Sequence, residues 1–153
     1  MTSPSLQFHV ITIFPEIFQS FLQTSLIGKA REAGLVGVSC VDPREFTTDK
    51  HNSVDDTPYG GGEGMVFKPE PVVMAMESVP GRPHRVLLTP QGKPLAQRDL
   101  QELASRDEVM LICGRYEGFD ERIRDQVELA IQSLSPQHAC AETPQSPIKI
   151  AAI

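Results

Sequence analysis

Several short stretches of the sequence combine residue types that are suited to binding or catalysis. Residues Pro58–Met65, PYGGGEGM, hold four glycines in five positions. Glycine permits positive φ angles and lets backbone N–H groups approach a phosphate or a base closely. No Gly-Lys-Ser/Thr follows, so the stretch is not a Walker loop. A flexible surface loop would have the same composition.

A second stretch, Gly114–Gly118, places a cation, an aromatic ring and a carboxylate between two glycines, directly after an apolar run. Arg115 could bind phosphate, and Tyr116 could stack on a base. Glu117 could accept hydrogen bonds from the N1–H and the exocyclic amine of a guanine. The alternative is an ordinary turn between a strand and a helix, with a carboxylate that caps the helix.

A third stretch, from Gly81 to Arg98, contains Arg82, Arg85, Lys93 and Arg98 and no Asp or Glu. The whole chain has a net charge of −6, so this is a local positive segment in an acidic protein. Phosphate contact is one hypothesis. Chance clustering of charges on a solvated face is the other.

The sequence holds no arrangement typical of a metal site. The three cysteines, Cys40, Cys113 and Cys140, are scattered, without a CxxC or a Cys/His cluster. They support neither a zinc site nor a disulfide framework, and they favour a reducing compartment. Asp55 and Asp56 are adjacent acids in a polar segment, which are ordinarily solvated. We expect no metal.

Composition favours a single globular domain. The chain has 153 residues, of which 40% are hydrophobic and 22% charged, and this length suits one domain with a hydrophobic core.

The apolar runs are too short to span a bilayer. The first basic residue is Lys29, so the start lacks the positive region of a secretory signal. We expect a cytoplasmic protein without a membrane span.

Strands and helices alternate along the chain. Apolar runs predict strands at Leu6–Phe14, Leu35–Val41, Arg85–Thr89 and Glu108–Cys113. Helical spacing predicts helices from Pro15 to a stop at Gly28, and at Pro71–Val79, Leu95–Ala104 and Glu121–Ile131. This order predicts an α/β fold, a mostly parallel sheet with helices on both faces. Ligands of such sheets bind beyond the carboxyl ends of the strands, where the turns Thr89–Gly92 and Gly114–Gly118 are expected.

Four segments together resemble one family. They are FPEIF at Phe14–Phe18, the PREFT…D…H…VDD…PYGGGEGM stretch at Pro43–Met65, LLTPQGKPL at Leu87–Leu95 and LICGRYEGFDERI at Leu111–Ile123. In this order they resemble the bacterial tRNA (guanine-N1)-methyltransferases, which belong to the trefoil-knotted (SPOUT) class. The resemblance runs from about Phe8 to Ile123, so it covers most of the chain.

The resemblance implies a homodimeric enzyme that moves a methyl group from S-adenosylmethionine to N1 of the guanosine 3′-adjacent to the anticodon of tRNA. It implies a deep knot, a rare exception to unknotted topology, and no metal. The implied cofactor-binding residues are Leu88, Thr89, Pro90, Gly114, Tyr116 and Glu117. The implied residues near the target guanine or the RNA are Tyr59, Gly60, Glu117, Arg44, Asp49 and His51.

The segment after Ile131 does not resemble the family. It carries three prolines and no sustained period, so we expect residues 1–131 to form the methyltransferase domain and residues 132–153 an unstructured tail. The family's catalytic Arg, its general-base Asp and its C-terminal tRNA-binding domain have no counterpart here. We therefore expect an incomplete knot, weak cofactor binding and no methyl transfer by these residues alone. The alternative function is a non-catalytic dimerising or RNA-binding module.

Overall fold

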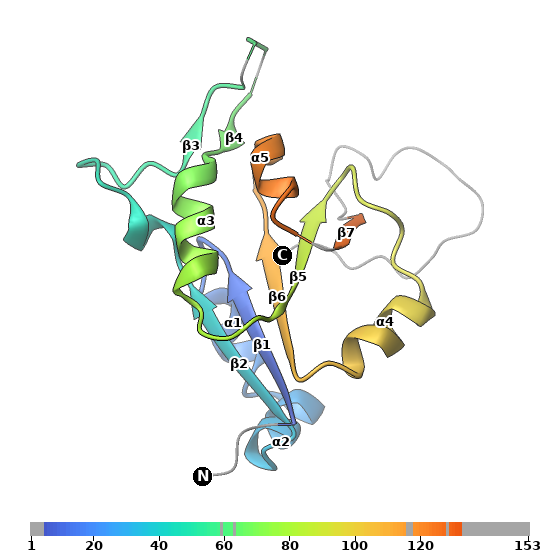
Figure 1. Ribbon diagram of the computed structural model, residues 1–153. Coiled ribbons are helices and arrows are strands. Elements are labelled where there is room, and N and C mark those ends of the chain that lie inside the picture. The colour runs from blue at the N-terminus through green and yellow to red at the C-terminus, as the bar shows by residue number, and fades with distance from the viewer. Residues whose placement is uncertain (1–4, 59, 63, 116–117, 128, 133–153) are drawn as a thin grey trace.

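The fold is built on a five-stranded sheet in which every strand pair is parallel (Figure 1). The computed structural model describes residues 5–58, 60–62, 64–115, 118–127 and 129–132. The strand order is β2-β1-β6-β5-β7. The strands are β1 (Leu6–Ile11), β2 (Val36–Val41), β5 (His84–Thr89), β6 (Glu108–Cys113) and β7 (Leu129–Gln132). The predicted α/β class with a mostly parallel sheet is confirmed.

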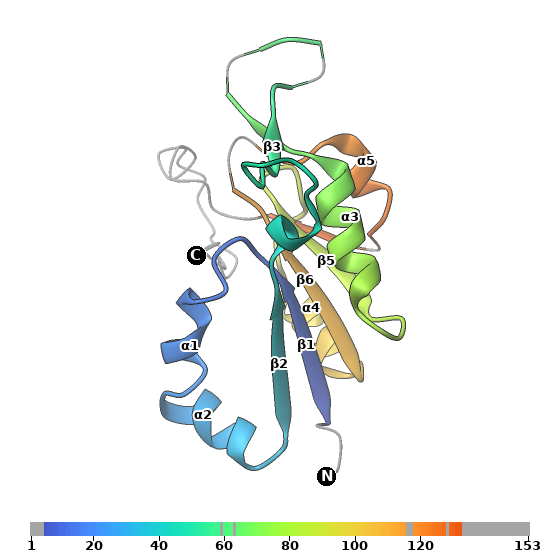
Figure 2. The same cartoon turned by 90° about the vertical axis from the view of Figure 1, so that its left-hand side faces the viewer.

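Helices cover both faces of the sheet, as predicted. Helices α3 (Pro69–Ser78) and α5 (Glu121–Arg124) lie on one face, and α1 (Ile17–Phe21) and α2 (Ser25–Glu32) lie on the other (Figure 2). Successive strand side chains point to opposite faces. Leu87 therefore joins the core beneath α3, while Val86 and Leu88 pack with Leu100 and Leu103 of α4 (Gln97–Ala104) on the opposite face.

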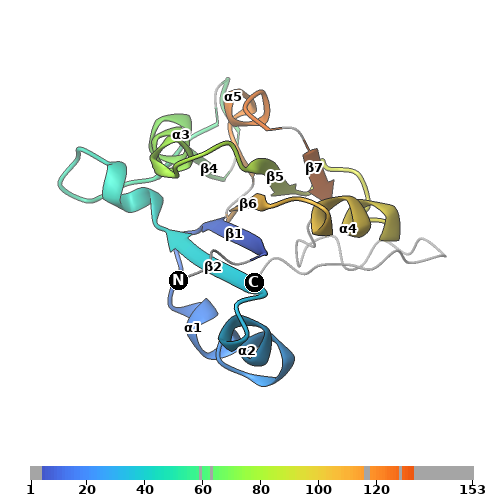
Figure 3. The ribbon, with the colours of Figure 1, turned by 60° about the horizontal axis from the view of Figure 1, so that its bottom comes forward.

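The predicted helix from Pro15 to Gly28 is wrong in its extent, because two short helices replace it. Residues Leu22–Thr24 separate α1 from α2 (Figure 3), and Gly28 lies buried inside α2 instead of ending a helix. A Cβ atom at Gly28 would lie 2.7 Å from the backbone oxygen of Gln23. Glycine is needed there for a close backbone approach, not for a helix stop.

The predicted helix Glu121–Ile131 is also wrong in its second half. Helix α5 ends at Arg124, and β7 pairs with β5 so that Ile131 stands opposite Leu88. A short apolar run fits a helix and a buried strand equally well by spacing alone. The unpaired edge of β5 decides the outcome, since pairing satisfies its backbone N–H and C=O groups.

The long connector Asp42–Gly64 contains more structure than the sequence predicted. A 3-10 turn, η1, covers Pro43–Phe46, and β3 (Asp55–Asp56) pairs antiparallel with β4 (Val66–Phe67). The β3–β4 pair stands at the carboxyl end of the sheet, beyond α3 (Figure 1).

The positive segment between Gly81 and Arg98 does not form one patch on the surface. Strand β5 separates Arg82 from Lys93 by six residues, which is roughly 20 Å.

The expected unstructured tail and the expected knot fall on residues 133–153, which lie outside the described residues. Gln132, the first residue of the expected tail, belongs to β7. No helix within the described ranges is long and apolar enough to cross a membrane.

Candidate functional site

The turns that follow β5 and β6 lie side by side at the carboxyl end of the sheet. Leu88 stands opposite Cys113 in the β5–β6 pairing, and Thr89 stands opposite Gln132 in the β5–β7 pairing. Thr89 and Gly114 therefore leave neighbouring strands at the same level. The structure brings together four residues expected around the cofactor: Leu88, Thr89, Pro90 and Gly114. The other two, Tyr116 and Glu117, lie outside the described residues.

The turn after β5 is closed by short-range hydrogen bonds. The N–H of Gly92 donates to the backbone oxygen of Thr89 over 3.1 Å, and the buried Thr89 hydroxyl donates to Oε1 of Gln91. The Nε2 atom of Gln91 lies 4.0 Å from the position that a Cβ would take at Gly118. The Gln91 side chain therefore lies near Gly118 of the β6 loop, a proximity that the sequence did not predict.

Gly114 is the point where the β6 loop is packed most tightly. A Cβ atom there would lie 2.4 Å from Cε2 of the Phe119 ring, closer than any real contact. The Phe119 ring in turn stacks on Phe67, with centroids 5.3 Å apart and an interplanar angle of 18°. Phe119 therefore fixes the course of the loop after β6. The sequence analysis missed Phe119; the signal was a glycine at a strand end, which often marks a close neighbour.

The glycine-rich stretch is fastened to this same loop. The backbone N–H of Phe67 donates to the backbone oxygen of Gly118 over 3.1 Å, and the backbone N–H of Asp120 donates to the backbone oxygen of Phe67 over 3.4 Å. The loop between β3 and β4 carries Gly60, Gly61, Gly62 and Gly64, whose φ angles are 91°, 84°, 141° and 96°. These angles are strained for any other residue. The expected Gly60 thus lies in a loop joined to the β6 loop, while Tyr59 lies outside the described residues.

An open cleft of about 570 Å³ lies between these loops, lined by Pro58, Val66, Phe119, Asp120, Glu121 and Arg122. Its size is within the range of small-molecule sites. Arg122 donates to Asp120 through its side chain and its backbone N–H, over 2.9 Å in each case, and this holds the pKa of Asp120 below its ordinary value. Asp120 therefore remains a carboxylate at the mouth of the cleft.

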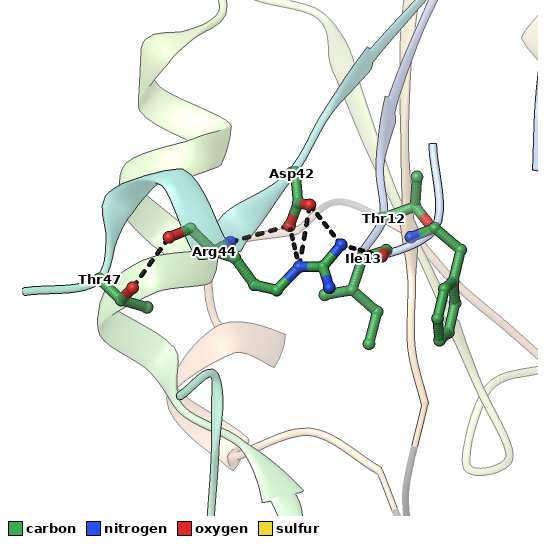
Figure 4. A network of polar contacts seen from close by, with 6 residues as sticks. Thr12, Ile13, Asp42, Arg44 and Thr47 are labelled. Carbon is green, nitrogen blue, oxygen red and sulfur yellow. Dashed lines mark hydrogen bonds and ion pairs between the residues drawn. The ribbon is translucent and has the colours of Figure 1, made fainter. Parts of the chain in front are cut away.

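Arg44, expected to face RNA, is engaged within the protein (Figure 4). Its guanidinium pairs with Asp42 at 2.7 Å and donates to the backbone oxygen of Ile13 over 2.6 Å. Thr47 donates to the backbone oxygen of Arg44 over 2.8 Å. This network ties the segment after β2 to the segment after β1, so Arg44 has a structural task beside any contact with RNA.

Asp49 and His51 lie farther along the same exposed segment. The Asp49 carboxylate accepts N–H groups of Ser53 and His51 over 3.0–3.2 Å, and the Ser53 hydrogen bond above all lowers the pKa of Asp49. Both residues follow β2, which β1 and β6 separate from β5 in the sheet. Arg44 joins their segment to the loop after β1 through its hydrogen bond to Ile13.

Within the described part of the chain, no group of three or more His, Cys, Asp and Glu side chains could hold a metal ion. Asp55 and Asp56 form β3 and pair through their backbone with Phe67 and Val66. Burial raises the pKa of the Cys113 thiol to about 12, so the thiol is neutral beside Gly114. The described end of the sheet thus combines apolar walls and backbone groups with the charged side chains of Asp120 and Arg122.

Comparison with known proteins identifies relatives of this arrangement. The family described as tRNA (Guanine-1)-methyltransferase TrmD matches residues 6–135. A tRNA (guanine-N(1)-)-methyltransferase of Synechococcus sp. (strain JA-3-3Ab) is 55% identical over 124 residues, which are 80% of this chain and 49% of the relative. Another, from Synechocystis sp. (strain ATCC 27184 / PCC 6803 / Kazusa), is 48% identical over 141 residues, 91% of this chain and 61% of the relative.

A solved structure agrees with the sequence comparisons. The crystal structure of tRNA (m1G37) methyltransferase from Aquifex aeolicus has a TM-score of 0.78 and 41% identity, over 85% of this chain and 60% of that chain. This chain spans about half to three-fifths of the length of the curated relatives it matches. The family match covers both loops of the candidate site and the strands that position them. The chain therefore belongs to the tRNA (Guanine-1)-methyltransferase family.

Proposed function

We propose that this chain takes part in the transfer of a methyl group from S-adenosylmethionine to N1 of the guanosine immediately 3′ of the tRNA anticodon, position 37. The observation that carries the proposal is the pairing of Leu88 with Cys113, which brings the Thr89 and Gly114 turns to one edge of the sheet. The family membership supports a tRNA guanosine as the substrate, and so does the similarity to the tRNA (m1G37) methyltransferase of Aquifex aeolicus. A tRNA substrate would place the protein in the cytoplasm.

The cofactor side of the proposed site consists of Leu88, Thr89, Pro90, Gly114, Tyr116 and Glu117. Leu88 contributes an apolar wall and the Thr89–Gly92 turn a closed backbone loop. Gly114 lacks a side chain, which lets the Phe119 ring pack against it and bound this side of the site. An apolar wall with a few convergent polar groups suits the adenosine part of the methyl donor.

The substrate side consists of Tyr59, Gly60, Glu117, Arg44, Asp49 and His51. Gly60 belongs to the β3–β4 loop, which Phe67 ties to the β6 loop. Guanine N1 bears a proton and is a poor nucleophile until a base removes it, so a carboxylate within hydrogen-bond reach is required. Donors near O6 would stabilise the developing anion. The sulfonium of S-adenosylmethionine supplies an activated methyl group, so the remaining task of the protein is in-line positioning.

We further propose that the protein acts as a homodimer. Four apolar residues of α1 and α2 are exposed, and Leu26 exposes 77% of its residue surface; they are Ile17, Phe21, Leu26 and Ile27. The residues that the structure describes do not cover these apolar side chains. Contiguous exposed apolar groups of this kind mark interaction surfaces, and a second copy of the chain is the occupant that the resemblance implies.

Two measurements test the proposed activity. S-adenosylmethionine is titrated calorimetrically into the chain and into a chimera, in which residues 1–131 precede the second half of the Synechocystis relative. Both are then assayed on a tRNA transcript with guanosine at position 37 and on a control with adenosine there. The chimera is expected to methylate only the guanosine transcript, whereas the chain alone is expected to bind the donor weakly and to transfer nothing. A folded chimera without transfer would contradict the proposal, and RNA binding without donor binding would favour the non-catalytic module.

A further inference from the structure

Arg115 is held over an aromatic ring at the carboxyl end of the sheet. Its guanidinium carbon lies 4.9 Å from the centroid of the Phe14 ring, a distance typical of a cation–π contact. Arg115 follows β6 and Phe14 follows β1, and these two strands are neighbours. The contact therefore joins two loops at the edge of the sheet where the proposed site lies.

The ring beneath Arg115 is itself fixed. The N–H of Phe14 donates to the Thr12 hydroxyl over 3.1 Å, and its backbone oxygen accepts the N–H of Ile17 over 3.2 Å. The preceding residue, Ile13, accepts the hydrogen bond from Arg44. Phe14 also packs against the core beneath α3. The guanidinium thus rests on a rigid platform, which lowers the entropy that it would lose on binding a ligand.

The charge of Arg115 has no carboxylate partner among the described residues, and this distinguishes it from neighbouring arginines. Arg44 pairs with Asp42, and Arg122 pairs with Asp120. The guanidinium carbon lies over the ring, and a guanidinium carries five N–H donors in a planar fork. Two of these donors can match two oxygens of a phosphate in a bidentate contact.

We propose that Arg115, positioned by Phe14, binds a phosphodiester of the RNA at this edge of the sheet. The inference rests on the proposed function, because it takes the bound polyanion to be tRNA. Arg115 is exposed, and its contact with Phe14 holds it at the end of the sheet that carries the proposed site. One phosphate contact contributes about 0.7 to 0.9 to the slope of log K against log salt, which provides a direct measurement.

The test measures binding of an anticodon stem-loop, with guanosine 3′ of the anticodon, to the 153-residue chain over a series of salt concentrations. Arg115→Gln is expected to weaken binding about tenfold and to lower the salt slope by about 0.7 to 0.9. Arg115→Lys should keep the slope and lose part of the affinity, since the charge remains but the planar fork is lost. Phe14→Leu should likewise keep the salt slope, because the charge of Arg115 remains. It should weaken RNA binding, because the ring that positions the guanidinium is lost.

Arg82→Gln is the matched control, because it removes the same charge from an exposed residue before the amino end of β5. It should leave the affinity within about twofold, as expected for a remote exposed charge. The thermal unfolding midpoint of Arg115→Gln should lie close to that of the wild type, because Arg115 is exposed and an exposed cation–π contact contributes only about 0.5–1 kcal/mol. An Arg115→Gln slope equal to that of Arg82→Gln overturns the inference and leaves the proposed function intact. A wild-type chain that binds neither RNA nor S-adenosylmethionine overturns both.

Discussion

The ring of Phe119 lies directly on Gly114, so that a Cβ atom at residue 114 would be 2.4 Å from the ring. This contact links the first residue after β6 to the aromatic stack with Phe67 and hence to the glycine-rich loop. Gly114 is thus required by packing, since its φ is not in the left-handed region. The β6 loop and the glycine-rich β3–β4 loop are therefore joined through this one close approach.

Gly114→Ala should destabilise the chain by about 1–3 kcal/mol, the usual cost of an added methyl group in a tightly packed place. Urea unfolding measures this free energy. Phe119→Leu should relieve the clash, so the double variant should lose less stability than the sum of the single losses. Strict additivity of the two losses would contradict the contact.

Gly61→Val should weaken RNA binding by distorting the β3–β4 loop. The φ of Gly61 is 84° and nothing lies within 4 Å of an added Cβ, so the effect is backbone strain of about 1–3 kcal/mol and not a clash. Gly34→Val is a matched control, since Gly34 has a φ of 70°, equally open space and a position between α2 and β2. Filter binding of tRNA should distinguish the two variants, with donor binding retained in both. Equal RNA affinities would exclude a role of the loop in RNA binding.

Asp99 should make the stability of the chain depend on pH in the acidic range. Its hydrogen bonds from Lys93, 2.6 Å, and from the N–H of Ala96 lower its pKa below the ordinary 3.8. The folded state therefore holds this proton less tightly than the unfolded state, and the stabilisation is complete above the unfolded pKa. It is lost as the pH falls through the folded pKa.

The urea midpoint of the wild type should accordingly fall more steeply than that of Asp99→Asn between about pH 5 and pH 2. Glu102→Gln is the control on the same helix, because the Glu102 carboxylate is exposed. Its urea midpoint should fall with pH as steeply as that of the wild type. Parallel pH profiles for the wild type and Asp99→Asn would contradict the expectation.

Leu26→Asp should shift the protein from dimer to monomer in sedimentation velocity. The substitution places a charge on the most exposed apolar side chain of α2, in the surface that we propose to be covered by a second copy. Met74→Asp is the control, because Met74 is 48% exposed on α3, on the opposite face of the sheet. An unchanged sedimentation coefficient for Leu26→Asp would place the dimer interface elsewhere.

Much of the candidate site was predictable because its parts are local in sequence. The apolar run ending at Cys113 predicted a buried strand, and a parallel sheet places loops at the carboxyl ends of its strands. The runs at Arg85–Thr89 and Glu108–Cys113 became β5 and β6 with nearly the predicted bounds. Their adjacency, however, depends on strand order, which no local pattern records.

Three features follow from residues that are neighbours along the chain: the α/β alternation, the glycine loop with positive φ and the segments typical of the family. The strand at Ile131 has another origin, since it depends on the free edge of β5 as a partner. The tertiary fold also places Phe119 on Gly114 and Arg115 on Phe14. Such contacts join residues of different loops, and they form only after the sheet has brought the strand ends together.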